Sequence, residues 1–148
     1  DMLIRSTVDP TLAPPGKHGA CLFCQHFAYE LPNKLHWDGI REAAADHVID
    51  TVARYAPNFK GAVLGRKILS PLDLEREFGL TGGDIFHGAL TLGQIWSARP
   101  VLGHANYRAP VRGLYLCGAG AHPGGGVSGL PGHNAAREIV RDLRRRRV

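Results

Sequence analysis

The chain has 148 residues, of which 44% are hydrophobic, so it is long enough for one ordinary domain with a core and too short for two. No stretch approaches the roughly 20 consecutive apolar residues of a membrane-spanning helix, and the N-terminus lacks the charged and then apolar pattern of a secretory signal. We therefore expect no transmembrane segment and a cytoplasmic location.

The positive charge lies at one end of the chain. The formal net charge is +5, and the last eight positions include Arg141, Arg144, Arg145, Arg146 and Arg147. A basic run at the end of a helix is favoured by the helix dipole and is usually only solvated, so we expect no nucleic-acid partner.

Two further features concern the state of the chain. Three cysteines are too few for a disulfide scaffold, and their odd number favours free thiols in a reducing compartment. The sequence starts at Asp1 rather than at a methionine and runs almost at once into strand-like sequence. We expect it to be part of a longer protein.

The first third of the chain predicts strands followed by a helix. Met2–Thr7 alternates loosely like a strand, and the aromatic-containing run Ala20–Leu31 favours a second strand after a proline-rich break. From Asp38 onward, apolar residues recur at three- and four-residue spacing, which predicts an amphipathic helix. Asp38 is expected to cap this helix and Pro57 to end it.

The middle of the chain is less regular. Apolar residues within Ala62–Leu69 suggest another strand. Ser70 then suits a helix cap, with Pro71 in the first turn of a short helix that ends near Gly79. Gly82–Tyr107 contains glycines and shows no clear period, and irregular segments of this kind often line sites.

The last third predicts a strand, a loop and a helix. Gly113–Cys117 is expected to be a short buried strand, Gly118–Gly129 a glycine-rich loop, and Leu130–Arg147 a helix. The residues of this helix expected to face inward are Ala135, Ala136, Ile139, Val140 and Leu143.

The glycine-rich loop carries the strongest chemical signal. Six of the sixteen residues from Leu114 to Gly129 are glycine, and glycines let backbone N–H groups approach an anion or a flat ring without an intervening Cβ. The first turn of the following helix would add unpaired N–H groups and the positive end of its dipole. A structural turn with glycines for tight packing explains the pattern equally well. The loop is neither a phosphate loop ending in Gly-Lys-Ser/Thr nor a Gly-x-Gly-x-x-Gly fingerprint, so its residues alone indicate an anion or a cofactor.

The segment from Tyr115 to Ala136 resembles a known flavin-binding motif. Its core reads Gly-Ala-Gly-x-His-Pro-Gly from Gly118 to Gly124, and it resembles the C-terminal motif of the phytoene desaturase and amine oxidase-like flavoproteins. The similarity covers the chain from about Asp9 to Val140. Its upstream part, which includes Leu72–Arg76, Gly82–Gly88 and Arg99-Pro100, looks like the branch of bacterial dehydrogenases and pyridine nucleotide-disulphide oxidoreductase-domain proteins.

This resemblance implies an α+β fold in two parts. Residues 1–110 would be part of the substrate domain, an antiparallel sheet with flanking helices, and residues 111–148 the C-terminal strand, glycine loop and helix of the FAD domain. The implied cofactor is FAD, with Gly118 to Gly120 near its ribityl and pyrophosphate groups and Gly125 to Gly129 beside the pyrimidine end of the isoalloxazine. The implied cofactor-binding residues are Gly118, Ala119, Gly120, His122, Gly125, Gly126, Val127, Ser128 and Gly129. The N-terminal Gly-x-Gly-x-x-Gly is absent, so the missing N-terminal FAD-binding portion is an expected partner.

Cysteines and histidines near these segments have simpler interpretations as well. Cys21 and Cys24 have the spacing of a redox or zinc pair, but positions three apart on a strand face opposite ways, so we expect core packing and no metal. Cys117 is expected to be a small core residue. His122 and His133 flank the loop, and each could bond the flavin or fix the loop.

Three upstream residues are candidates for chemistry. The resemblance places His87 near flavin and substrate, which makes it the candidate catalytic residue for proton transfer. Arg99 and Tyr107 are weaker candidates, with a surface salt bridge and a packed aromatic ring as their simpler interpretations.

The predicted function is that of a C-terminal portion of an FAD-dependent oxidoreductase, of dehydrogenase or desaturase type, that transfers hydride between flavin and a small hydrophobic carbon substrate. The isolated chain is expected to be inactive. The alternative is a non-enzymatic interaction or oligomerisation module without independent FAD binding, because uncovered apolar faces favour association into a homo-oligomer.

Overall fold

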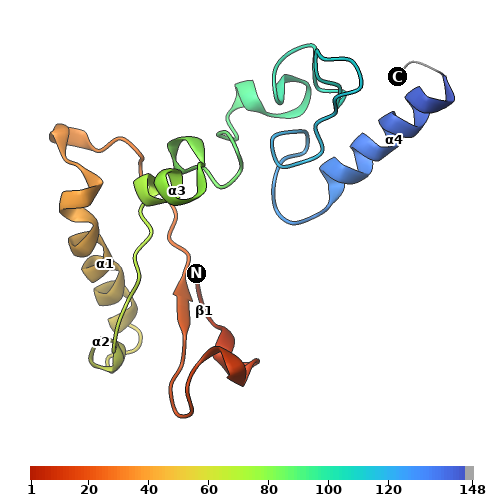
Figure 1. Ribbon diagram of the computed structural model, residues 1–148. Helices are drawn as coiled ribbons and strands as arrows, with labels where there is room; N and C mark the ends of the chain where they lie inside the picture. The colour runs from red at the N-terminus through yellow and green to blue at the C-terminus, as the bar shows by residue number, and fades with distance from the viewer. Residues whose placement is uncertain (146–148) are drawn as a thin grey trace. The chain divides into compact units, whose positions relative to one another are not determined.

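The computed structural model describes residues 1–145. The chain divides into two units, Asp1–Ile68 and Leu69–Val148. The described residues have an α+β composition, with a two-stranded antiparallel sheet and four α-helices joined by irregular segments (Figure 1). The connecting segments include the 3₁₀ turns Arg5–Thr7, Pro10–Leu12, Pro32–Lys34, Thr81–Gly83, Leu92–Gln94 and Trp96–Ala98.

The first unit begins with a small hairpin-like sheet. Strands β1 (Met2–Ile4) and β2 (Ala20–Leu22) pair antiparallel, with Met2 opposite Leu22. The two predicted strands are therefore confirmed only at their starts. The prediction of a strand as far as Leu31 is wrong, because β1 is only three residues long and offers no partner beyond Leu22.

Helix α1 (Trp37–Ala53) confirms the predicted helix but not its cap. The N-cap is His36, whose Nδ1 accepts a hydrogen bond from the Asp38 amide at 3.4 Å. Asp38 lies in the first turn instead, where its negative charge suits the positive end of the helix dipole. The helix ends ahead of Pro57, as expected.

Trp37 is the buried hydrophobic residue of this unit, with 5% of its surface exposed. Its indole Nε1 donates to the carbonyls of Ala28 and Tyr29, each at 3.1 Å. The Phe27 ring meets the indole edge-on, with 5.9 Å between ring centroids. One aromatic residue therefore fastens the irregular segment before α1 to the start of that helix.

The segment after α1 differs from the strand that the sequence predicts. Helix α2 (Phe59–Ala62) is followed by residues 63–69, which run back beside α1 in Figure 1 and pair with no strand in the described residues. Arg66 holds this segment to α1 through Glu42 at 2.6 Å and Asp46 at 2.5 Å. The strand predicted within Ala62–Leu69 is wrong, because side-chain ion pairs rather than a backbone ladder fix this segment.

Helix α3 (Pro71–Phe78) begins the second unit as the sequence predicts. Ser70 Oγ accepts from the Asp73 amide at 3.2 Å, and the Asp73 carboxylate accepts from the Ser70 amide at 2.9 Å, which completes a capping box. Gly79 ends the helix with a φ of 67°, a conformation that glycine adopts at little cost. All the determinants of this helix lie within ten residues.

The buried strand predicted at Gly113–Cys117 is wrong. The structure has one isolated bridge there, between Arg108 and Tyr115, supported by a bond from the Leu116 amide to the Tyr107 carbonyl at 2.8 Å. Cys117 is exposed rather than part of a core. The pairing stops because only a few residues around Arg108 run beside this segment.

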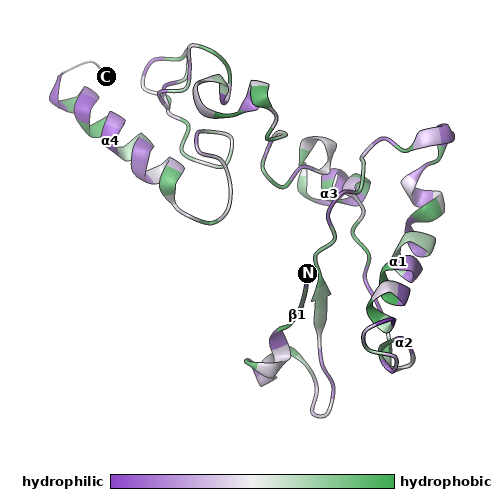
Figure 2. Ribbon diagram, turned by 180° about the vertical axis from the view of Figure 1, so that it is seen from behind, coloured by the Kyte–Doolittle hydropathy of each residue, from purple (hydrophilic) through white to green (hydrophobic). Residues whose placement is uncertain are grey.

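Helix α4 (Leu130–Arg144) confirms the predicted C-terminal helix as far as Arg144, and Arg146 and Arg147 lie outside the described residues. Figure 2 shows hydrophilic and hydrophobic residues alternating along it. The buried residues are Pro131, Ala135 and Asp142. Of the positions predicted to face inward, Ala135 is buried and Ile139 half-buried, whereas Ala136, Val140 and Leu143 are exposed.

The inner face of α4 is set by what packs on it. Ala135 forms a small cluster with Tyr107 and Ala121, and Asp142 is buried by its bonds to Arg108. The side of α4 that packs on the rest of the unit therefore includes the charged Asp142, and part of the apolar stripe of the helix stays exposed.

None of the helices in residues 1–145 combines the length and hydrophobicity needed to cross a membrane.

Candidate functional site

The loop predicted at Gly118–Gly129 is confirmed as an irregular connection that leads into α4. Its first half is two consecutive turns, closed by bonds from the Ala121 amide to the Gly118 carbonyl at 3.0 Å and from the Gly124 amide to the Ala121 carbonyl at 2.8 Å. Ala121 and Gly124 are buried. The loop therefore has an inner side that packs on its own chain and an outer side that does not.

Two glycines on the inner side have a structural reason, which is packing at Gly125 and backbone conformation at Gly124. A Cβ at Gly125 would lie 2.9 Å from the ring of Phe86, which is closer than side chains tolerate. A Cβ at Gly124 would lie 3.5 Å from Leu90 and 3.7 Å from Nε of Arg99, at a φ of +103° that side chains rarely adopt. Gly125 therefore supports the interpretation of the glycines as packing residues, whereas the positive φ accounts for Gly124.

Gly118 and Gly120 are different. A Cβ at either position would meet nothing within 4 Å, and neither residue has a positive φ. Nothing in residues 1–145 therefore requires glycine at these two positions. Bare backbone facing open space is what the close approach of a flat or anionic group requires.

The tip of the loop is exposed and conformationally unusual. Gly126 and Gly129 have φ values of 111° and 70°, so their backbone conformation explains the choice of glycine. Val127 has a φ of 56° and a fully exposed side chain. A β-branched residue in this region is strained, and such strain clusters at binding sites. Ser128, also exposed, follows it.

The first turn of α4 offers fewer donors than the sequence suggests. The Leu130 amide donates to Ser128 Oγ at 3.3 Å, Pro131 has no N–H, and the His133 amide donates to the Gly129 carbonyl at 3.0 Å. Anion binding here would depend on the loop backbone more than on the helix terminus.

Tyr107 joins the loop to α4. Its hydroxyl donates to the His122 carbonyl at 3.0 Å and accepts from Asn134 Nδ2 at 2.9 Å, and its ring is buried beside Ala121 and Ala135. The packed-aromatic interpretation of Tyr107 is therefore confirmed. His122 takes part through its main chain, and His133 is exposed.

Arg99 departs most from its simple interpretation. It is 1% exposed and forms no surface salt bridge within the described residues; instead, its guanidinium donates to main-chain carbonyls, including that of Ala119 in the loop. The surface salt bridge expected for Arg99 is therefore wrong. The signals in the sequence that pointed to this residue are its place in a glycine-containing irregular segment and the resemblance carried by Arg99-Pro100.

His87 is exposed and lies in a turn closed by a bond from its amide to the Asp84 carbonyl at 3.1 Å. Within the described residues, no hydrogen bond joins its ring to residues 118–129. Its neighbour Phe86 contacts the loop instead, beside Gly125.

A cluster of ionic side chains fixes α4 to the segment before the loop, and no sequence pattern indicated it. Arg108 Nε donates to Asp142 at 2.6 Å and Nη2 donates to Glu138 at 2.7 Å, while the Tyr115 hydroxyl donates to Asp142 at 2.9 Å. The two carboxylates raise the pKa of Arg108. Desolvation, followed by the bond to Asp142, raises the pKa of Tyr115.

The cysteines do not take the places that the sequence predicts. Cys21, Cys24 and Cys117 are free and exposed, so none of them packs in a core. Cys24 lies beyond the end of β2, because the strand is shorter than predicted. Among residues 1–145, no three histidine, cysteine or acidic side chains gather as a metal site would need.

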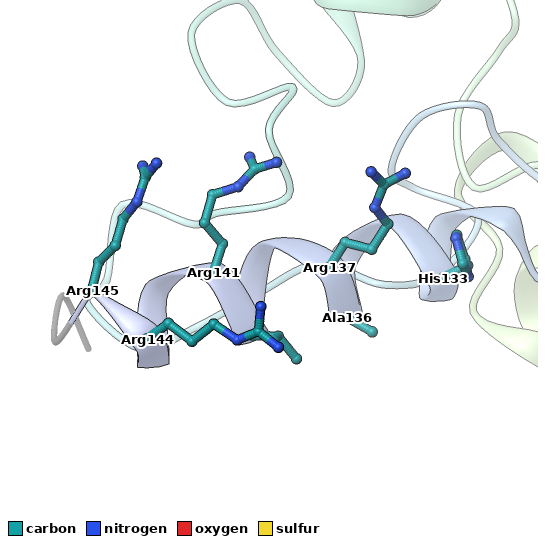
Figure 3. A pocket seen from close by; sticks show the side chains of 7 residues that line it. His133, Ala136, Arg137, Arg141, Arg144 and Arg145 are labelled. Atoms are coloured by element: carbon teal, nitrogen blue, oxygen red, sulfur yellow. The ribbon is translucent and has the colours of Figure 1, made fainter.

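The outer face of α4 forms a shallow, basic depression (Figure 3). His133, Ala136, Arg137, Val140, Arg141, Arg144 and Arg145 line it. Arg141 is paired with Glu138 at 2.5 Å. The depression includes none of the residues of the glycine loop.

No protein-family model matches the chain, and no solved structure is significantly similar to it. The chain is 55% identical over 145 residues to pyridine nucleotide-disulfide oxidoreductase domain-containing protein 2 of Rattus norvegicus. This alignment covers 97% of the chain and 25% of the rat protein. It is 29% identical over 114 residues to a limonene dehydrogenase subunit of Castellaniella defragrans, covering 76% of the chain and 21% of the relative. It is 30% identical over 137 residues to a phytoene desaturase (lycopene-forming) of a Paracoccus species, covering 90% and 26%.

The chain thus spans about a quarter of the length of the curated relatives it matches. The match to the rat protein extends over nearly the whole chain, including the glycine loop and α4. These similarities relate the chain to an oxidoreductase family.

Proposed function

We propose that the chain is the C-terminal part of an FAD-dependent oxidoreductase and forms the side of the cofactor site that closes over the flavin ring. The substrate would be a hydrophobic carbon compound, and the bound flavin would exchange a hydride with it. The names of two relatives, a limonene dehydrogenase subunit and a phytoene desaturase, support redox chemistry on hydrocarbons.

One observation carries the proposal. Gly118 and Gly120 are glycines that neither the packing nor the backbone conformation of this chain requires. A cofactor lying against their bare backbone is a reason for glycine that packing and φ do not supply at these two positions. By contrast, packing against Phe86 accounts for Gly125 in the same loop, and a positive φ accounts for Gly124.

The residues around the loop would bind and orient rather than react. Tyr107 and Arg99 hold the two ends of the turn through main-chain carbonyls, so the backbone facing the ring is fixed before the cofactor binds. Hydride transfer at carbon does not itself require a protein base. His87 stays the candidate for any accompanying proton transfer, since it shares the unit of the loop.

The test uses the natural gene product that contains this sequence, with its intact mass and bound flavin determined first. Gly118→Ala and Gly120→Ala are then compared with Gly65→Ala, an exposed glycine that also has open space and no positive φ. A methyl group between backbone and ring should weaken FAD binding by roughly 5- to 150-fold, which corresponds to an overpacking cost of about 1–3 kcal/mol.

Thermal unfolding without cofactor distinguishes a role of Gly118 and Gly120 in FAD binding from a role in the stability of the loop. Replacing a glycine at a compatible φ lowers the entropy of the unfolded chain, so all three variants should be as stable as the parent or up to about 1 kcal/mol more stable. Normal FAD affinity in Gly118→Ala and Gly120→Ala, or a gene product without flavin, would contradict the proposal.

A second function, an interaction or oligomerisation module, is favoured by the amount of exposed apolar surface. Val8, Tyr55, Leu64, Leu92 and Leu102 are each more than 70% exposed, while Trp37, Tyr107, Ala121 and Ala135 are the buried hydrophobic residues of the described part of the chain. Exposed apolar side chains in this number would favour association with another chain. Light scattering after size exclusion should show the 148-residue chain as an oligomer, and a monomer at high concentration would exclude self-association.

A further inference from the structure

The proposed function uses the main-chain hydrogen bonds of Arg99 but leaves its buried positive charge unused. Arg99 is the largest fully buried side chain in the described residues, with 1% of its surface exposed. Arginine is almost never fully buried unless it is paired with an opposite charge, because desolvating an uncompensated charge is costly.

The partners of Arg99 are all neutral. Nε and Nη2 donate to the Ala119 carbonyl at 3.1 and 2.6 Å, Nη1 donates to the carbonyls of Gln94 at 3.2 Å and Gly88 at 3.4 Å, and Nη2 also donates to that of Phe86. No carboxylate in residues 1–145 pairs with it. The N–H donors are therefore satisfied, while the positive charge itself is not neutralised.

These bonds place the charge directly behind the loop. Three of the acceptor carbonyls lie in the segment from Phe86 to Gln94, and the fourth belongs to Ala119, between the two glycines whose backbone is bare. A Cβ at Gly124 would lie 3.7 Å from Nε, so the turn from Gly118 to Gly124 wraps the guanidinium. Loosening Arg99 would release the turn.

We propose that Arg99 is a positioning residue that holds the glycine loop in shape and, through its unpaired charge, favours the more negative form of a bound flavin. The inference rests on the proposed function, since it assumes that the outer side of the loop faces the cofactor. Uptake of a hydride, which is one proton and two electrons, adds one unit of negative charge to the ring. A fixed buried cation binds that form more tightly than the oxidised one.

The experiment measures the affinity for oxidised FAD and the midpoint potential of the bound cofactor in the natural gene product. Arg99→Gln removes the charge, and the ratio of reduced to oxidised affinity should fall about tenfold, or about 30 mV for a two-electron couple. Arg99→Lys keeps the charge but loses the planar fork, so it should weaken both forms and leave the potential near that of the parent.

Arg137→Gln is the matched control, because it removes the same charge from an exposed position on α4. Solvent and salt screen that charge, so the potential should stay unchanged. Equal potentials in Arg99→Gln, Arg99→Lys and the parent would overturn the inference while leaving the flavin site intact.

Hydrogen exchange distinguishes failure of the inference about Arg99 from failure of the proposed function. Amides of Ala121 and Gly124, which close the two turns, should exchange at least about tenfold faster in Arg99→Lys than in the parent, with or without flavin. A gene product that binds no flavin would end the proposed function, and unchanged exchange would refute the positioning role of Arg99.

Discussion

Replacing Arg108 by alanine should release α4 from the segment that precedes the glycine loop. Arg108 makes three charged hydrogen bonds, two to Asp142 at 2.6 and 2.9 Å and one to Glu138 at 2.7 Å. The Asp142 side chain is 7% exposed, so the variant leaves a nearly buried carboxylate with the Tyr115 hydroxyl as a remaining partner. Breaking a buried pair costs about 3–5 kcal/mol, and since the Arg108 side chain is 31% exposed, water offsets part of this. We expect a loss of about 2–3 kcal/mol.

Hydrogen exchange of the α4 amides in the 148-residue chain measures this loss directly, because exchange rates report the free energy of local opening. The expected increase is roughly 30- to 150-fold. Arg141→Ala is the control: Arg141 also pairs with Glu138, but its side chain is 47% exposed, and such a pair contributes about 0–1 kcal/mol. If α4 exchanges no faster in Arg108→Ala than in Arg141→Ala, the buried carboxylate does not hold the helix.

Two further predictions concern the second unit. Gly83→Ala would bring a Cβ to 2.2 Å from the Pro71 carbonyl oxygen at a φ of +67°, so we expect about 2–4 kcal/mol of destabilisation, seen as a lower urea midpoint; an unchanged midpoint would contradict the close contact. The pKa of Tyr115 is raised by desolvation and by its bond to Asp142, so its contribution to stability is complete below about pH 10 and is lost as the pH rises through the folded pKa. Tyr115→Phe should therefore reduce the alkaline loss of stability in urea titrations, and an identical alkaline loss would show that this hydroxyl does not titrate with folding.

Local chemistry explains which elements could be predicted. Every determinant of α3 lies within its own sequence, from the Ser70 cap to Gly79, and the prediction is confirmed at both ends. The strands predicted within Ala62–Leu69 and at Gly113–Cys117 are wrong because a strand needs a neighbour, and apolar or β-branched residues cannot reveal whether one exists. The β propensity of a segment indicates that it could pair with a neighbouring strand, but it does not indicate whether the fold supplies that strand.

The same distinction applies to the candidate site. The loop and the start of α4 are visible in the sequence, since glycine density and helical periodicity are local signals. The division of the glycines into packing positions and bare positions is not visible there. It depends on Phe86 and Arg99, which contact the loop from distant positions in the chain.

The carbonyl partners of Arg99 give the site an uneven tolerance to substitution. Because each acceptor is a main-chain oxygen, changing the side chain of Gln94 or Ala119 leaves that oxygen available, whereas no other residue type can place a planar fork of donors at position 99. Substitutions of the Gln94 and Ala119 side chains can therefore accumulate without breaking the hydrogen bonds that Arg99 donates to these main-chain oxygens. Homologues aligned over this region would then share the arginine while differing at positions 94 and 119, whose oxygens it binds.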